Sequence, residues 1–198
     1  MPAAGSAPRG RSITVRETYR TMNVRSQPGV TVDAAKIRTV LGHFCSGVTV
    51  IAAVIDGKPV GFTCQSFASL SLDPPMVTFA PARTSTTWPK IRQAGTFCVN
   101  VLSDAHRELS NAFARSGSDK FAGVRWRSSR RGTPVLDGVV AYVDCRLWAE
   151  YDGGDHTIVA ASVLDLAADS TRRPLLVHRS QYGLQEPDPE PLDRTGRR

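Results

Sequence analysis

The stretch from Gly61 to Pro75 combines hydrogen-bonding groups with apolar anchors in a way that a plain core strand does not. Gly61 permits a close approach of the backbone to a neighbour. Hydroxyl and amide groups are supplied by Thr63, Gln65, Ser66, Ser69 and Ser71. The residues expected to anchor the stretch in a core are Phe62, Phe67, Leu70 and Leu72. Pro74 and Pro75 then end it. The pattern predicts a strand with a contact surface for a flat, amphipathic ligand.

A second polar segment lies downstream, between Pro81 and Pro89. It places Arg83 beside four consecutive hydroxyl residues, just before a short helix expected through Ile91; these residues are Thr84, Ser85, Thr86 and Thr87. The free N–H groups at a helix start and a planar guanidinium both suit an anion such as phosphate. The alternative is an ordinary helix cap with a surface arginine, and the loop taken alone favours that alternative.

Length and composition indicate one globular domain. The chain has 198 residues, of which 41% are hydrophobic and 22% are charged. Its formal net charge is +7, but much of this charge lies near the ends, where residues 1–30 hold five arginines and one acid. Basic residues interleaved with aromatic ones are not visible in the body of the chain, so we expect no nucleic-acid partner.

Cysteine and histidine usage favours a cytoplasmic protein without a metal site. The cysteines stand singly in apolar runs and form no CxxC pair; they are Cys45, Cys64, Cys98 and Cys145. We therefore expect reduced, buried thiols. The four histidines are equally scattered. No apolar run has the length of a membrane span or a signal peptide, so no membrane association is expected.

The two ends of the chain differ in composition from its middle. Residues 1–30 are rich in Pro, Gly, Ser and Arg without periodicity, which predicts a disordered basic tail. Met22 is a candidate for an alternative translation start, which leaves open whether the first 21 residues are translated. Residues 184–198 are rich in proline and charge and are expected to form a mobile tail. The folded domain is thus predicted over residues 31–183.

The first half of that domain begins with a helix and a hairpin. Asp33 is suited to cap a helix whose apolar positions are Ile37, Val40, Leu41 and Phe44. The β-branched run over 48–55 predicts a strand buried on both faces. Asp56-Gly57 predicts a hairpin turn, and the return strand is the Gly61–Pro75 stretch itself.

The remaining elements follow in the same way. Further strands are expected over 76–80, 96–102, 139–151, 157–166 and 173–179. Ser103 or Asp104 is expected to cap a helix with Leu109, Ala112 and Phe113 on one face. Residues 116–138 have the composition of a loop, and their basic run at 125–131 is expected to be a solvated surface.

This order of elements predicts a mainly-β fold with seven or so strands and three helices. Parallel sheets need a helix between most strands, which this chain lacks. No GxGxxG motif follows a strand, so a dinucleotide fold of that type is not expected. A closed antiparallel β-barrel with a few helices packed outside fits best.

Several short segments carry a family likeness when they are taken together. They are Gly47–Ile51, Pro59–Ala68, Ser71–Pro75, Phe97–Leu102, Asp119–Gly123 and Asp152–His156. They occur in family order between Leu41 and Tyr182, and this run resembles the small flavin-reductase components of two-component aromatic monooxygenases. Among these it is most similar to the reductases of phenol and steroid-phenol hydroxylases. The resemblance implies a flavin-reductase split barrel of the Greek-key type, a homodimer, and reduction of FMN or FAD by NADH or NADPH. It also implies a flavin-dependent oxygenase partner, reached mainly by diffusing reduced flavin.

The same resemblance assigns roles to residues. Those that should line the isoalloxazine ring, largely through main-chain groups, are Gly61, Phe62, Thr63, Cys64, Gln65 and Ser66. Those that should hold the ribityl chain and phosphate are Ala80, Pro81, Arg83, Thr86 and Thr87. Phe113 should pack near the flavin, although Ala112 stands where relatives often carry a basic residue. His156 matches a histidine that faces the nicotinamide, and Tyr182 matches an aromatic residue near the dinucleotide.

The implied reaction needs little acid–base chemistry from the protein, because the two cofactors carry the hydride transfer and the site stacks their rings. His156 would orient the nicotinamide or donate to reduced flavin; the alternative is a turn histidine that bonds local carbonyls. Cys64 is expected to be a small buried side chain. A non-catalytic flavin-binding barrel and an oxidase of the pyridoxamine phosphate type stay open as alternatives. The Asp152–His156 turn favours the reductase.

Overall fold

The computed structural model describes residues 32–117 and 119–186. The predicted disordered segment 1–30 and most of the predicted mobile segment 184–198 lie outside these residues. The helices are α1 (Ala34–Leu41), α2 (Trp88–Ala94) and α3 (Arg107–Ala114), the last preceded by the 3₁₀ turn η1 (Asp104–His106). The first strands are β1 (Ser46–Gly47), β2 (Thr49–Ile55), β3 (Lys58–Cys64), β4 (Ala68–Leu72), β5 (Pro75–Phe79) and β6 (Thr96–Val101). The later ones are β7 (Trp126–Ser128), β8 (Pro134–Leu136), β9 (Ala141–Gly153), β10 (His156–Ala168), β11 (Leu176–His178) and β12 (Gln181–Tyr182).

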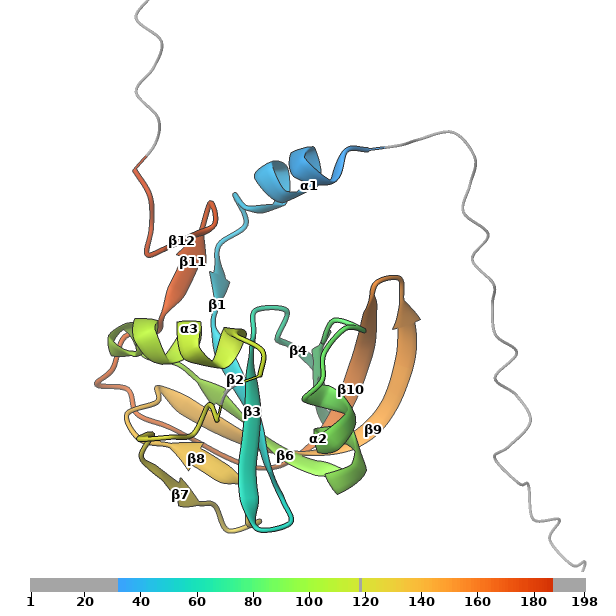
Figure 1. The fold of residues 1–198 in the computed structure, drawn as a ribbon, viewed down its shortest axis with the longest axis vertical. Coiled ribbons are helices and arrows are strands. Elements are labelled where there is room, and N and C mark those ends of the chain that lie inside the picture. The colour runs from blue at the N-terminus through green and yellow to red at the C-terminus, as the bar shows by residue number, and fades with distance from the viewer. Residues whose placement is uncertain (1–31, 118, 187–198) are drawn as a thin grey trace, which may run out of the picture.

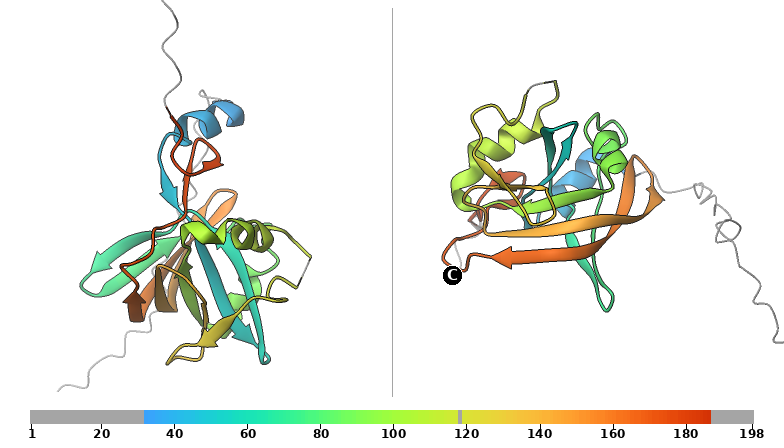
Figure 2. Two further views of the ribbon diagram at one scale, coloured as in Figure 1. Left: turned by 90° about the vertical axis from the view of Figure 1, so that its left-hand side faces the viewer. Right: turned by 90° about the horizontal axis from the view of Figure 1, so that it is seen from below.

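Seven of these strands form one curled antiparallel sheet in the order β3-β2-β6-β9-β10-β5-β4. Strands β9 and β10 are its longest members, and they curve along the right-hand side of the barrel in Figure 1. Helices α2 and α3 pack on the outside, α2 against β2, β3 and β6 and α3 over β3 and β2 (Figures 1 and 2). The mainly-β barrel with outer helices is therefore confirmed.

The prediction of one strand across the Gly61–Pro75 stretch is wrong. Strand β3 ends at Cys64, which pairs with Thr49 at the start of β2, so the ladder has no partner residue beyond this point. The chain then crosses to the opposite edge of the sheet, where β4 pairs with β5. Residues 65–67 thus connect the two edge strands, and the barrel is split between them.

The expected core anchors of this stretch divide in the same way. Phe62 is buried and Phe67 packs against the same core cluster, as predicted. Leu70 and Leu72 are 51% and 89% exposed, so the prediction that they lie in the core is wrong. The reason is their place on β4, an edge strand whose outer surface no described element covers.

Strand β2 divides the core into two clusters. Ile51 and Ala53 face a cluster that contains Phe79, Phe97 and the α2 residues Trp88 and Ile91. Val48, Val50 and Ala52 face a second cluster that contains Leu102, Phe113, Phe121 and Leu136. Successive side chains of a strand alternate between its two faces. The prediction that this strand is buried on both faces is confirmed, and each outer helix seals one cluster.

A hairpin of β7 and β8 lies inside residues 116–138, which were predicted to be a loop. Each strand has only three residues, too few to show a period. The hairpin is held by buried Asn100, whose side chain donates to Pro134 O at 3.1 Å and accepts from Leu136 N at 2.8 Å. Thr133 also donates to the buried Asp144 carboxylate. These long-range bonds explain why local sequence did not indicate the hairpin.

Helix α1 stands apart from the barrel, beside the small sheet of β1, β11 and β12, which itself packs against the second core cluster (Figures 1 and 2). Its predicted cap is confirmed, since Lys36 N donates to the Asp33 carboxylate at 3.3 Å. None of its residues is buried. Among the described residues, no helix combines the length and apolar character that crossing a membrane requires.

Candidate functional site

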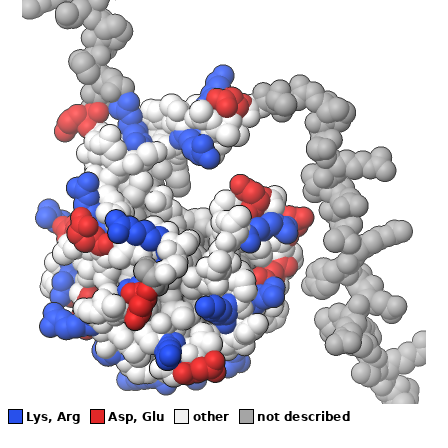
Figure 3. Space-filling model, viewed as in Figure 1, with Lys and Arg blue, Asp and Glu red and all other residues white. Residues whose placement is uncertain are grey.

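A hollow of about 480 Å³ opens where β3, the 80–87 loop, α3 and the β9–β10 turn meet. We call it the central hollow. Its lining includes residues 62–66, 80–82, 84–87 and 113–116, together with Lys120 and His156. On the face seen in Figure 3, acidic and basic side chains are interspersed around these elements. Segments that lie far apart in the sequence are thus brought to one space, and they include most of the residues to which the family resemblance assigned a role.

The wall formed by β3 offers mainly backbone groups. Because β3 is an edge strand that pairs only with β2, alternate N–H and C=O groups point away from the sheet. The nearby side chains are already bonded: the Thr63 hydroxyl donates to Ser110 O at 2.7 Å, and Ser66 Oγ accepts from Ala80 N at 2.7 Å. A ligand here would meet main-chain atoms, which is the mode of contact that the family resemblance implies for this segment.

Gly61 is needed for packing against the protein itself. A Cβ atom at this position would lie 3.0 Å from Ile51 O and 3.0 Å from a ring carbon of Phe113. Phe113 is fully buried and packs edge-on against Phe121, with ring centroids 4.9 Å apart. The close approach predicted from this glycine is therefore to Phe113, which in turn lines the central hollow.

The hydroxyl loop has Thr86 and Thr87 in the lining of the central hollow. In the described part of the chain, neither hydroxyl forms a hydrogen bond, whereas Ser85 Oγ accepts from Trp88 N, the first residue of α2, at 3.1 Å. Arg83 points elsewhere: its Nη2 lies 2.6 Å from Asp152 Oδ1, and its Nε donates to Gly154 O at 2.7 Å. The structure brings the threonines to the hollow but gives Arg83 a different partner.

His156 enters the central hollow from the turn between β9 and β10. Its Nδ1 lies 2.6 Å from Asp155 Oδ1, and because a carboxylate only accepts, Nδ1 carries a proton there. This contact lowers the pKa of Asp155, chiefly through the hydrogen bond with His156. The turn is fixed to the 80–87 loop by Arg83 N, which donates to Asp155 O at 2.9 Å, and by Thr157 N, which donates to Pro81 O at 3.0 Å.

Lys120 is a lining residue to which sequence reasoning assigned no role. Its Nζ donates to Phe113 O at 2.9 Å, and burial lowers the pKa of its ammonium group. The available signal was the segment Asp119–Gly123, which supported the family likeness without a function for its lysine. Lys120 therefore supplies a cation to the central hollow. Ala112, which stands where relatives often carry a basic residue, supplies none.

Two further predicted residues have other surroundings. Tyr182 lines a neighbouring hollow of about 610 Å³ that shares Gln65 and Ser66 with the central hollow. Its hydroxyl lies 2.8 Å from Asn111 Oδ1. Cys64 is buried, and burial raises the pKa of its thiol, which supports the expectation of an unreactive side chain. The four cysteines are unpaired, and three of them are buried.

Comparison with known families decides what kind of protein has this site. The family model described as "Flavin reductase like domain" matches residues 41–184. The chain belongs to the flavin reductase family. The matched range contains β1 to β12 and all the site residues described above.

Two curated relatives of this chain are named as reductases. The reductase subunit HsaB of a flavin-dependent monooxygenase from Rhodococcus jostii is 48% identical over 157 residues, which cover 79% of this chain and 80% of the relative. The FMN reductase (NADH) SmoA from Agrobacterium fabrum is 41% identical over 135 residues, which cover 68% of this chain and 77% of that protein.

Solved flavin reductase structures confirm the split barrel. A homologue of nitrilotriacetate monooxygenase component B from Mycobacterium thermoresistibile superposes with a TM-score of 0.73 at 43% identity, covering 80% of this chain and 93% of that one. The NADH:FAD oxidoreductase SgcE6 from Streptomyces globisporus gives a TM-score of 0.72 at 30% identity, covering 81% and 100%.

The residues of the central hollow fit a flavin. A flavin ring carries alternating N–H and C=O groups along one edge, and the open edge of β3 offers the complementary backbone groups. The unbonded hydroxyls of Thr86 and Thr87 and the ammonium group of Lys120 are donors for phosphate. His156 lies on the β10 side of the same hollow.

Proposed function

We propose that this chain is an NAD(P)H-dependent flavin reductase that supplies reduced FMN or FAD to a partner oxygenase. The observation that carries the proposal is the central hollow, where an open strand edge, two unbonded threonine hydroxyls and a carboxylate-held histidine surround one space. These are the groups needed to hold a planar ring, a phosphate and a second, nicotinamide ring against each other.

The work of the protein is to bind and orient. When bound, flavin supplies the redox chemistry by accepting a hydride at N5 from C4 of the nicotinamide. The β3 backbone fixes the ring plane, while Thr86, Thr87 and Lys120 fix the phosphate end. The buried ring of Phe113 closes the wall behind β3 and keeps water away from that side.

His156 orients the nicotinamide in this proposal. Asp155 holds the Nδ1 side of the imidazole, which leaves the Nε2 atom for a ligand. The carboxamide of the nicotinamide offers both N–H and C=O groups as partners for this atom. The rigid attachment of the turn to the 80–87 loop maintains that atom at a constant place relative to the phosphate donors.

The direct test follows NADH oxidation in aerobic buffer with and without added FMN or FAD. Stimulation by free flavin is expected, since flavin then acts as a substrate. If neither NADH nor NADPH is consumed while flavin still binds, the chain is a non-catalytic flavin-binding barrel. Oxidation of pyridoxine phosphate or pyridoxamine phosphate without NADH would instead indicate the third function class.

The His156→Ala variant tests the orienting role. We expect kcat/KM for NADH to fall by about 10–100-fold, because a misplaced nicotinamide loses the geometry of hydride transfer. Flavin affinity should stay within about twofold. His43→Ala is the matched control, since His43 follows α1 and does not line the central hollow. Unchanged NADH kinetics would remove His156 from the mechanism.

A homodimer, an oxygenase partner and a cytoplasmic location belong to the same proposal. Apolar side chains that a single copy leaves exposed support the dimer; among them are Val40, Leu41, Phe44 and Leu72. The partner receives reduced flavin mainly by diffusion, in keeping with the names of relatives that are reductase subunits of monooxygenases. Four unpaired cysteines and the use of NAD(P)H fit the cytoplasm.

A further inference from the structure

A second hollow of about 710 Å³ adjoins the central hollow and has no part in the function argued above. We call it the lysine hollow. It shares Thr86, Thr87 and Lys120 with the central hollow, so the two spaces meet at the proposed phosphate donors. Its remaining lining comes from Lys58–Gly61 of β3, Lys90 of α2, and the segment that carries Phe121 and Trp126.

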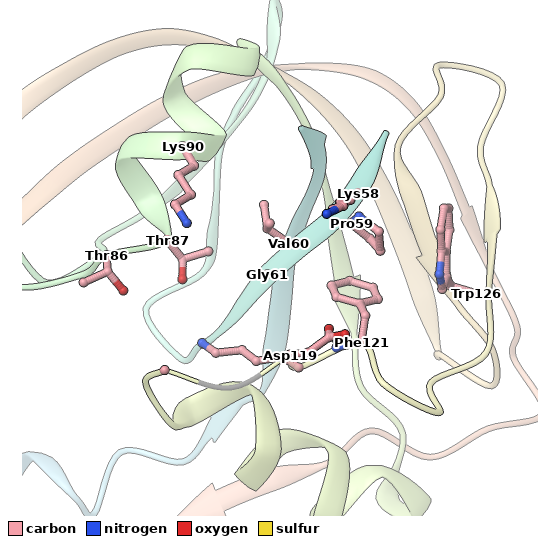
Figure 4. Close-up of a pocket in the computed structure, with 12 residues that line it drawn as sticks. Lys58, Pro59, Val60, Gly61, Thr86, Thr87, Lys90, Asp119, Phe121 and Trp126 are labelled. Atoms are coloured by element: carbon pink, nitrogen blue, oxygen red, sulfur yellow. Dashed lines mark hydrogen bonds between the residues drawn. The ribbon is translucent and has the colours of Figure 1, made fainter. Parts of the chain in front are cut away.

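The walls of the lysine hollow differ in chemistry. Figure 4 shows Lys90 and Thr87 on the α2 side, strand β3 between, and Phe121 and Trp126 on the other side. The rings of Phe121 and Trp126 are edge-on, with centroids 6.2 Å apart. Trp126 is only half-buried, so part of its indole is available to a ligand. An aromatic wall of this kind suits a planar base.

The charges point to an anionic ligand. Within the described ranges, the ammonium groups of Lys58, Lys90 and Lys120 form no ion pair. The one acid in the lining, Asp119, accepts a hydrogen bond from Phe121 N at 3.1 Å. A phosphate at the junction would offset the desolvation that lowers the pKa of Lys120. The hollow thus offers lysines for phosphate and an aromatic wall for a base.

These features distinguish the two flavin nucleotides. FMN ends at the phosphate held by Thr86, Thr87 and Lys120, and it would leave the lysine hollow unused. FAD continues from that same phosphate into an adenylate group, which has one further phosphate, a ribose and a planar base. We propose that the lysine hollow binds the adenylate arm of FAD and makes FAD the preferred flavin of this chain. The inference rests on the proposed function, because it takes the flavin phosphate to lie at the shared donors.

The adenylate of NADH is the competing occupant, and the geometry disfavours it. His156, where the nicotinamide is proposed to bind, lines the central hollow and not the lysine hollow. The FAD arm is covalently attached at the junction itself, whereas the NADH arm would have to pass the bound flavin to enter. Because the adenylate of FAD is covalently attached to the bound flavin, its binding does not carry the entropic cost of positioning a separate molecule.

The test measures binding of FAD and FMN by isothermal titration calorimetry, with Trp126→Ala and with the double variant Lys58→Met/Lys90→Met. The wild type is expected to bind FAD at least 10-fold more tightly than FMN. Either variant should raise the Kd for FAD toward that for FMN and leave the Kd for FMN within about twofold. Retained FMN affinity also establishes that the variants fold. Arg127→Met is the control, because this arginine lies on the same hairpin but packs over Tyr142.

Three outcomes would overturn the inference. Equal wild-type affinities for FAD and FMN, with NADH-dependent flavin reduction intact, would refute the FAD arm and leave the proposed function standing. A rise in KM for NADH without a change in FAD affinity would assign the hollow to the pyridine nucleotide. If Arg127→Met loses as much FAD affinity as Lys58→Met/Lys90→Met, the effect of the lysines is one of general surface charge and not of a specific site.

Discussion

Arg83 and His156 belong to different segments but meet at one turn. Arg83 bonds Asp152 and Gly154, and its backbone N–H donates to Asp155 O, directly before the histidine. The pKa of Asp152 is lowered, first by the hydrogen bond from Gly154 N and then by Arg83. These contacts make Arg83 a positioning residue for the turn, whereas the role in phosphate binding stays a prediction that would require this ion pair to open.

The Arg83→Met variant separates the two roles. If Arg83 positions the turn, KM for NADH should rise about 3–10-fold while the Kd for flavin changes less than twofold. The stability of the fold should be nearly unchanged, since the ion pair is solvent-exposed. Arg92→Met is the matched control, because Arg92 pairs with Glu150 on β9 away from the turn. A large rise in flavin Kd with unchanged NADH kinetics would restore Arg83 as a phosphate ligand.

Which side chains reach the hollow was predictable only in part. Composition alone marked two of the lining segments, the Gly61–Pro75 stretch and the hydroxyl loop, whereas the roles of Phe113 and His156 came from the family resemblance. The direction of the Arg83 side chain was not predicted, because its partner Asp152 is distant in sequence and only the folded barrel brings the two residues together. Lys120 was missed for the same reason: its partner, Phe113 O, lies on α3.

At the scale of elements, the join between β3 and α3 positions the wall of the central hollow. Gly61 lies against the Phe113 ring, so the helix approaches the strand more closely than any other residue would allow. Thr63 then bonds the backbone of Ser110 on the same helix. This contact sets the distance between the open strand edge and the 113–116 side of the hollow.

The Gly61→Ala variant tests this contact. The added methyl group overpacks the strand–helix join, and we expect a loss of about 1–3 kcal/mol in the free energy of unfolding, measured by urea titration. Flavin affinity should fall as well, because Phe113 must move. Gly47→Ala is the control: nothing lies within 4 Å of the added Cβ, and stability should change by less than about 1 kcal/mol. Equal stability of the two variants would contradict the packing argument.

Long, strongly patterned elements were predicted well from the sequence, and short or interrupted ones were not. β2, β6 and the long pair β9 and β10 lie close to their predicted ranges because β-branched runs and turn residues mark them. The break after Cys64 was missed because both halves of the stretch carry strand-like composition. Only the closure of the barrel shows that they pair at opposite edges.

At the scale of the whole molecule, α1 and β4 expose apolar side chains that a single copy does not cover. Phe44 after α1 is 82% exposed and Leu72 on β4 is 89% exposed. Burying such side chains contributes roughly 1.5–3 kcal/mol each. The proposed homodimer would bury the apolar side chains of both elements. Its contacts would also hold α1 against a barrel of the dimer.

Light scattering after size exclusion tests the dimer. The wild type should give twice the chain mass of 21.4 kDa. Phe44→Glu should shift the protein toward the monomer, because a buried unpaired charge opposes association. Lys36→Glu on α1 is the control for an added acid at an exposed position. A wild-type mass of one chain at micromolar concentration would refute the homodimer.

The central claim is that the hollow brings nicotinamide and flavin together for hydride transfer, and anaerobic flavin absorbance tests it most directly. With equimolar FAD and NADH and a trace of the protein, the 450 nm band of oxidised flavin should bleach with one NADH consumed per flavin. The rate should scale with protein concentration and fall in the His156→Ala variant. A band that persists with NADH and with NADPH, while flavin binding is measurable, would contradict the account.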